Sequence, residues 1–161
     1  MNNSVVRSAG AAALALLLTG CQLGPRPLAV PPAAPSGEWA VVNVRMGASI
    51  VRNPAAAMAR IGQLIRYEPT LAISGEATCQ YPQYLASDML AERYLFSEFG
   101  VHTGDLGLYR WQDVRITEVF CNGRKWLGLG ADAFWIDHDR GYAVKDDVLY
   151  ELRRTSTAHT R

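Results

Sequence analysis

The dipeptide Asn122-Gly123 constrains the fold of this chain more than any other feature of its sequence. It stands between residues 114–121 and 124–130, two runs with the apolar and β-branched content of strands. Asn-Gly favours a two-residue type I′ turn, because both central residues of that turn need positive φ. The sequence therefore predicts a β-hairpin here.

The length of the turn also fixes the expected register of the hairpin. A two-residue loop pairs Phe120 with Lys125 and Val119 with Trp126. Side chains on a strand alternate between its two faces, so the register decides which of them share a face. We expect the core face to carry Ile116, Phe120, Leu127 and Leu129.

Hydrophobic patterns outline five further strands. Pro69 and Asp146-Asp147 are typical turn residues and separate some of these segments. The strands are expected over residues 38–46, 63–67, 71–74, 133–136 and 148–152. In the first of them, the alternation predicts one face made of Ala40, Val42, Val44 and Met46.

Two segments are expected to be helical. Asn53-Pro54 is typical of a helix N-terminus, with an Asn cap followed by Pro, and Gly62 is expected to stop that helix. Ser87 or Asp88 is the expected cap of a second helix that ends at Gly100. Its apolar stripe is formed by Leu90, Tyr94 and Leu95.

These elements together indicate a β-rich α+β fold. About seven strands, following one another through short turns, favour an antiparallel arrangement. We expect a small antiparallel β-barrel or a curved meander sheet, with one or two short helices covering it. The length of the chain leaves room for one such domain.

The N-terminus has the pattern of an export signal. Residues 11–18 form an apolar run that is too short to span a bilayer but suits a signal peptide. Leu18-Thr19-Gly20-Cys21 follows, and it resembles the lipobox of bacterial lipoproteins. The resemblance implies that residues 1–20 are removed and that Cys21 carries the lipid chains, palmitate among them. The alternative is an ordinary secretory signal, or a buried apolar segment that a Cys follows by chance.

The residues after Cys21 complete this prediction. By the lipoprotein pattern, Gln22 implies sorting to the outer membrane, with the folded domain in the periplasm. Residues 21–37 are rich in Pro and form the expected tether, which at about 3.1 Å per residue could hold the domain up to roughly 45 Å from the lipid. The domain is expected over residues 38–154 and a disordered tail over 155–161. Residues 38–154 contain 13 Lys and Arg against 15 Asp and Glu, a net charge of 13 − 15 = −2, so we expect no nucleic-acid partner.

Two cysteines remain once Cys21 is lipidated. Cys79 and Cys121 would then face an oxidising compartment, where such a pair forms a disulfide. We expect this bond to hold the loop of residues 78–84 against the outer side of the hairpin. A redox-active pair is the alternative, but the Cys-x-x-Cys spacing is missing.

Aromatic residues are the candidates for a binding surface. Tyr, Trp and Arg are the residues from which protein interfaces make their anchors. We place the binding surface at Tyr81, Tyr84, Arg93 and Tyr94. Phe96, Phe99, Tyr109 and Trp111 belong to the same aromatic content, and the alternative is that all these rings build the core.

Patterns for catalysis and metal binding fail when they are tested. Asp137-His138-Asp139 does not continue as an EF-hand loop, and His102 and His159 are isolated, so we predict a solvated turn and no metal or cofactor. Gly47-Ala48-Ser49 lacks the second Gly of a nucleophile elbow. The acidic residues give no reason to choose two for glycan hydrolysis. We expect a protein that is not an enzyme.

Three functions follow in order of preference. Gly37-Glu38-Trp39 and a last strand ending in Leu152-Arg153-Arg154 resemble lipocalin-like and META-type envelope domains. The Gly-Cys-Asn segment of META domains is absent, and the resemblance therefore supplies no functional residue. The first hypothesis is a module that binds a protein or another envelope component, as an inhibitor or assembly factor. The second is a carrier of a small apolar molecule, and the third is a cell-wall hydrolase.

Overall fold

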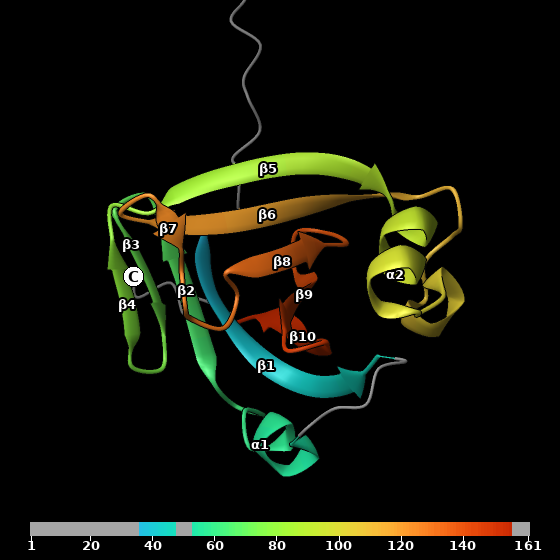
Figure 1. Cartoon of the computed structure of the whole chain (residues 1–161), viewed down its shortest axis with the longest axis horizontal. Helices are drawn as coiled ribbons and strands as arrows, with labels where there is room; N and C mark the ends of the chain where they lie inside the picture. The colour runs from blue at the N-terminus through green and yellow to red at the C-terminus, as the bar shows by residue number, and fades with distance from the viewer. Residues whose placement is uncertain (1–35, 48–52, 156–161) are drawn as a thin grey trace, which may run out of the picture.

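Ten strands belong to one antiparallel sheet in the computed structural model, which describes residues 36–47 and 53–155 (Figure 1). The strands are β1 (Gly37–Met46), β2 (Leu64–Glu68), β3 (Leu71–Ser74), β4 (Ala77–Gln80), β5 (Gln83–Leu90), β6 (Asp113–Cys121), β7 (Arg124–Lys125), β8 (Asp132–Trp135), β9 (Arg140–Lys145) and β10 (Val148–Arg154). The helices are α1 (Pro54–Met58), α2 (Ala91–Phe99) and the short 3₁₀ helix η1 (Thr103–Leu106).

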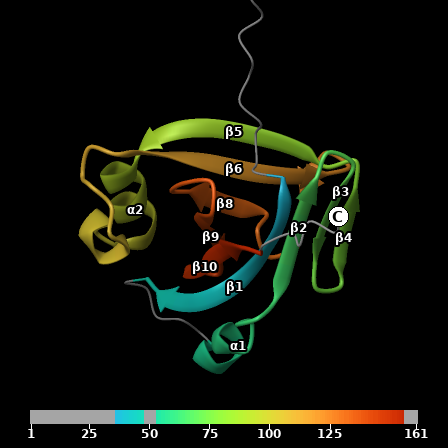
Figure 2. The ribbon, with the colours of Figure 1, turned by 180° about the vertical axis from the view of Figure 1, so that it is seen from behind.

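The sheet curls strongly but does not close into a complete barrel. Its strand order is β4-β3-β2-β1-β10-β9-β8-β6-β5, and β7 pairs with β6 beside this path. Cys79 of the end strand β4 nevertheless forms a disulfide with Cys121 of β6, across a Cα–Cα distance of 5.7 Å. Figures 1 and 2 show β2, β3 and β4 bending round from β1 toward the end of β6. This curled half-barrel with short covering helices confirms the predicted fold class.

Two buried clusters lie on opposite faces of the part of the sheet formed by β6, β8, β9 and β10. The inner cluster contains Trp39, Tyr67 and Trp135, and the ring of Trp135 lies 4.7 Å from Trp39 and 5.8 Å from Tyr67. The outer cluster contains Phe134, the neighbour of Trp135 on β8, together with Leu95 of α2. A strand buried on both faces is apolar at consecutive positions, which explains the run Ala-Phe-Trp on β8.

The hairpin has the predicted turn and register. Asn122 and Gly123 both have positive φ, Phe120 pairs with Lys125, and the amide of Trp126 donates to the carbonyl of Val119 over 2.9 Å. The prediction of its core face was wrong, because Val119 and Trp126 are buried in the inner cluster.

The expected core residues of the hairpin are therefore divided. Leu127 is 83% exposed, and Phe120 is half-buried. Ile116 is buried in the outer cluster, while Leu129 lies in the inner one after the chain has left β7. The two faces of β6 thus contribute to different clusters along its length.

β1 contains an irregularity that the alternation could not show. Trp39 and Val41 are buried, and the pairing with β10 then shifts between Val41 and Asn43. An extra residue reverses the side-chain parity, so Val44 packs against the inner cluster while Val42 is exposed. The prediction that Ala40, Val42, Val44 and Met46 share one face was therefore wrong, because the shift places Val42 and Val44 on different sides.

The first helix and the strands after it agree with their predictions. The Asn53 side chain accepts a hydrogen bond from the amide of Ala56 at 3.0 Å, and Pro54 begins α1. Gly62, with φ of 88°, follows the helix and precedes β2. β3 has the predicted bounds, and β2 is displaced from them by one residue.

The second helix begins later than predicted, and its end is as predicted. Residues 83–90 form β5, and neither Ser87 nor Asp88 caps α2. The first amide of the helix, at Ala91, donates instead to the carbonyl of Gln112 over 2.8 Å. Gly100 ends the helix in a left-handed conformation with φ of 63°. Pairing with β6 along its whole length keeps β5 extended.

Three strands, β4, β5 and β9, lie outside the strands predicted from sequence. β4 and the first two residues of β5 lie in the segment expected to be a loop, and Cys79 lies in β4 on the inner side of the sheet. The disulfide is therefore present as predicted, but it faces the core and not the outer side of the hairpin. Cys121 shares a face with Val119, which is the buried face.

The predictions for the two ends of the chain fall mainly outside the described residues. The expected signal peptide, Cys21 and residues 22–35 of the expected tether are not described, nor are residues 156–161 of the expected tail. Thr155, which was placed in the tail, donates its hydroxyl hydrogen to the carbonyl of Glu38 at 3.1 Å.

Candidate binding surface

Several exposed aromatic rings lie together at the end of the molecule formed by α2, η1 and the loop before β6. Figures 1 and 2 show α2 at one end of the long strands β5 and β6. The Gly100 amide donates to Phe96 O at 3.0 Å and the Val101 amide to Leu95 O at 3.2 Å, which turns the chain from α2 back toward η1. Leu106 and Leu108 are buried in the outer cluster and hold the following loop against the domain.

The carboxylate of Glu92 fastens α2 to η1. It accepts hydrogen bonds from the Thr103 hydroxyl at 2.6 Å and the Thr103 amide at 3.2 Å, and His102 Nδ1 lies 3.2 Å away. These hydrogen bonds, those from the Thr103 hydroxyl and from His102 above all, lower the pKa of Glu92 to about 2. The positive charge of Arg110 acts in the same direction. Glu92 is therefore a fixed negative charge at neutral pH.

Tyr109 and Trp111 project from the loop in the opposite direction to its buried leucines. Their rings are stacked at 5.4 Å between centroids with an interplanar angle of 10°. Tyr109 is 66% and Trp111 is 76% exposed. The amide of Gln112 donates to the Tyr109 carbonyl at 3.0 Å, which closes a turn around the stacked pair. The two rings form a flat, ordered platform facing solvent.

A hollow of about 420 Å³ lies beside this platform. It is lined by Glu92, His102, Thr103, Tyr109, Arg110 and Trp111 among others. Phe96 is exposed on α2, and its ring lies 5.0 Å from that of His102, so it extends the aromatic surface past the hollow. We call Phe96, His102, Tyr109, Arg110 and Trp111 the aromatic surface. It combines flat apolar rings with the cation of Arg110, and the anion of Glu92 lines the hollow beside it.

The predicted residues Tyr81 and Tyr84 lie at the other end of β5. Tyr81 is 76% exposed, with φ of 54°, and its amide donates to the Thr70 carbonyl at 2.8 Å. Tyr84 is half-buried, and its hydroxyl donates to the Glu68 carbonyl at 2.8 Å. Burial raises the pKa of Tyr84 to about 12. Tyr84 thus fastens β5 to β2, and Tyr81 alone of the two is presented to solvent.

The other two predicted residues lie on α2 and also differ in exposure. Arg93 is exposed. Tyr94 packs edge-on against Phe99 at 5.5 Å and Phe134 at 5.7 Å, and burial raises its pKa. The eight residues of β5 separate Tyr81 from α2 by roughly 25 Å at the rise of a strand. The structure therefore does not bring the four predicted binding residues into one surface.

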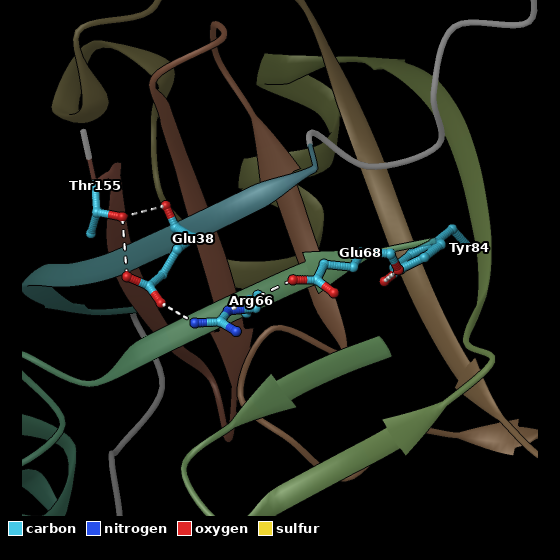
Figure 3. A network of polar contacts seen from close by, with 5 residues as sticks. All are labelled: Glu38, Arg66, Glu68, Tyr84 and Thr155. Carbon is cyan, nitrogen blue, oxygen red and sulfur yellow. Dashed lines mark hydrogen bonds and ion pairs between the residues drawn. The ribbon is translucent and has the colours of Figure 1, made fainter. Parts of the chain in front are cut away.

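A polar network on the outside of the sheet has a structural role (Figure 3). Arg66 lies 3.0 Å from Glu38 Oε2 and 3.9 Å from Glu68 Oε1, and Thr155 donates to the Glu38 carbonyl. The network joins β1, β2 and the residue that follows β10, while Tyr84 adds β5 to it. The charges in it are paired with one another and tie strands together.

The described residues show no constellation that would indicate catalysis or metal binding. Within residues 36–47 and 53–155, no three His, Cys, Asp or Glu side chains come together as metal ligands would. Asp137, His138 and Asp139 form the β8–β9 turn, where the Asp139 amide donates to the Asp137 side chain at 2.9 Å. The pKa values of Asp88 and Glu92 are both lowered, which is opposite to the shift that a general acid needs.

The residues of the aromatic surface were only partly visible in the sequence. Phe96, Tyr109 and Trp111 belong to the aromatic content noted there, but His102 was set aside as an isolated residue. Its partner Glu92 is ten residues away, and only the fold brings them together.

None of the helices among the described residues is long and apolar enough to cross a membrane. Comparison with protein-family models, curated proteins and solved structures finds no match to this chain.

Proposed function

We propose that this chain is a lipoprotein anchored to the outer membrane, and that its periplasmic domain binds a protein or another envelope component through the aromatic surface. The lipobox-like Leu18-Thr19-Gly20-Cys21 and the Pro-rich residues after it support the anchor. Three acyl chains on Cys21 would hold the chain at the membrane without help from the domain. The binding role rests on the domain itself.

The single observation that carries the binding role is the exposed stack of Tyr109 on Trp111. Large aromatic rings facing water mark interaction sites, and Trp, Tyr and Arg dominate the binding energy of interfaces. A pair that is already stacked loses little side-chain freedom on binding. Arg110 stands between the two rings in sequence, and it lines the adjoining hollow together with Glu92. These two charged side chains can orient a partner bound at the rings.

The packing of the inner cluster favours this function over the carrier. A carrier holds its ligand in an internal cavity. The interior of the half-barrel is instead occupied by large rings in contact, with Trp39, Tyr67 and Trp135 each 5% exposed or less. The hydrolase ranks third because it needs a carboxylic acid with a raised pKa, whereas that of Glu92 is lowered.

The test compares one tryptophan, Trp111, with one tyrosine, Tyr81, of equal exposure. The full chain, with its own N-terminus, would be expressed in a bacterial envelope and purified in mild detergent under non-reducing conditions. Native mass spectrometry would then identify any retained component in the wild type, in Trp111→Ala and in Tyr81→Ala. Both side chains are 76% exposed, so neither change should unfold the domain.

We expect one protein or envelope component on the wild type and on Tyr81→Ala, and its loss from Trp111→Ala. Loss from Tyr81→Ala with retention by Trp111→Ala would contradict the aromatic surface and return the site to the β4–β5 turn. A small apolar molecule held by all three chains would favour the carrier.

A further inference from the structure

The free edge of β5 is a second feature that the binding role does not use. Among the described residues β5 pairs with β6 alone, and it lies along the margin of the molecule in Figures 1 and 2. All its residues except Tyr84 are exposed, and it contains neither Pro nor Lys. Natural proteins usually protect such an edge, because its unpaired backbone groups can pair with another strand.

The hydrogen bonds of β6 identify the backbone groups that remain free on β5. The Val119 amide donates to Ala131, and the Val119 carbonyl accepts from Trp126, so Val119 directs both groups away from β5. Because these directions alternate along a strand, residues 114, 116, 118 and 120 direct theirs to β5. Their partners on β5 are Met89, Ser87, Leu85 and Gln83. The intervening residues Tyr84, Ala86, Asp88 and Leu90 therefore point their N–H and C=O groups to the free edge.

The side chains of β5 are complementary to a second copy of β5 in one antiparallel register. A two-fold axis perpendicular to the sheet through Ser87 places Leu85 opposite Met89 of the second copy and Ala86 opposite Asp88. Both Leu85 and Met89 are exposed in the single chain. In this register Leu85 of each copy covers Met89 of the other, so the contact occurs twice in the pair. The four residues with free backbone groups face one another, so every one of them gains a partner.

The neighbouring register is less favourable. With the axis through Ala86, Met89 would face Gln83, and Leu90 would face Pro82, which has no N–H to donate. The register with the axis through Asp88 is unfavourable for a different reason, because it would place the two Asp88 carboxylates opposite each other. With the axis at Ser87, Asp88 keeps its two hydrogen bonds of 2.9 Å from Arg115 and faces Ala86 of the second copy.

We infer that β5 pairs with β5 of a second copy of this chain, in the antiparallel register with Ser87 on the two-fold axis, to form one sheet across two molecules. The Pro-rich residues 23–37 of the chain itself are an unsuitable partner for this edge, because Pro has no N–H to donate to a strand. Only three residues with an N–H lie between Pro27 and Pro31.

Cysteine cross-linking tests this register directly. Residues facing each other on a two-fold axis, between hydrogen-bonded rows, have Cα atoms about 4.5 Å apart, which suits a disulfide. Ala86 and its copy would lie about 8 Å apart, too far for a disulfide. The full chain carrying Ser87→Cys, and separately Ala86→Cys as the matched control, would be oxidised in the envelope and run on a non-reducing gel.

We expect most of the Ser87→Cys chain at twice the mass of the monomer, and Ala86→Cys at the level of the wild type. A third variant, Ala86→Pro, removes a free edge N–H without touching the ladder to β6, and it should convert the wild-type dimer to a monomer in light scattering. Protection of its Cys79–Cys121 disulfide from a mild reductant would report that the domain is folded, because Cys79 is fully buried in the fold. Equal cross-linking of Ser87→Cys and Ala86→Cys, a monomeric wild type at tens of micromolar, or a cross-link from position 87 to a different protein would each overturn the inference.

Discussion

Cys79 and Cys121 join the first edge of the sheet to the strand beside its other edge. They are 42 residues apart in sequence, and six strands lie between β4 and β6 in the order of the sheet, yet their Cα atoms are 5.7 Å apart. The disulfide therefore holds the sheet curled around the inner cluster. Cys79 is fully buried, so the bond is part of the core as well as a link.

Removing this bond should lower the stability of the domain substantially. Closing a loop of this length contributes about 4 kcal/mol on the chain-entropy estimate. We expect Cys79→Ser with Cys121→Ser to lower the free energy of unfolding by roughly that amount, as measured by urea denaturation against the wild type. An unchanged midpoint would contradict the role assigned to the bond in closing the sheet.

The contact of Glu92 with Thr103 predicts a dependence of stability on pH. The pKa of Glu92 in the folded domain is about 2, below its ordinary value of 4.5. A lowered pKa means that the ionised form stabilises the fold, so this contribution is complete above pH 4.5 and is lost as the pH falls toward 2. We expect Glu92→Gln to be less stable than the wild type at pH 7 and to differ little from it near pH 2. Glu98→Gln, an exposed change on the same helix, is the control. The difference between its stability and that of the wild type should not become smaller as the pH falls from 7 to 2.

The two tryptophans that face opposite environments should differ sharply when replaced by alanine. Trp135 is buried and contacts Trp39, so Trp135→Ala should cost about 3–5 kcal/mol of stability. Trp111 is exposed, and Trp111→Ala should stay within about 0.5 kcal/mol of the wild type. Chemical denaturation of both variants checks this. A large loss at Trp111 would mean that its ring serves packing and not binding.

The anchor makes a separate prediction. Replacing the lipidated residue by Cys21→Ser should abolish the incorporation of labelled palmitate and release the chain from the membrane fraction. Labelling that persists in this variant would contradict the lipobox, without bearing on the aromatic surface. The Ser87→Cys variant is a suitable control, since its N-terminus is unchanged from the wild type.

Local sequence signals predicted those elements that depend on neighbouring residues. The Asn122-Gly123 turn, the Asn53 cap and the Gly100 helix end are all present, because each is decided by the backbone preferences of a few residues. The parity of β1 could not be predicted in the same way. The shift after Val41 appears only in the pairing with β10, more than a hundred residues later.

The same limit explains what was missed at the candidate surface and at the edge of the sheet. Residues 88–90 were expected in a helix, but eight consecutive pairs with β6 keep them extended. Glu92 and His102 meet only because Gly100 reverses the chain between them. Exposure of Trp111 is likewise a property of the fold, since its neighbour Leu108 is buried.

The aromatic surface is tested most directly by photo-cross-linking from two positions in the living envelope. A photoreactive amino acid would replace Trp111 in one full chain and Tyr81, which is equally exposed, in another. The proposed function predicts that position 111 cross-links to one defined envelope component and that position 81 does not cross-link to it. The same component reached from position 81, with nothing reached from position 111, would contradict the proposal.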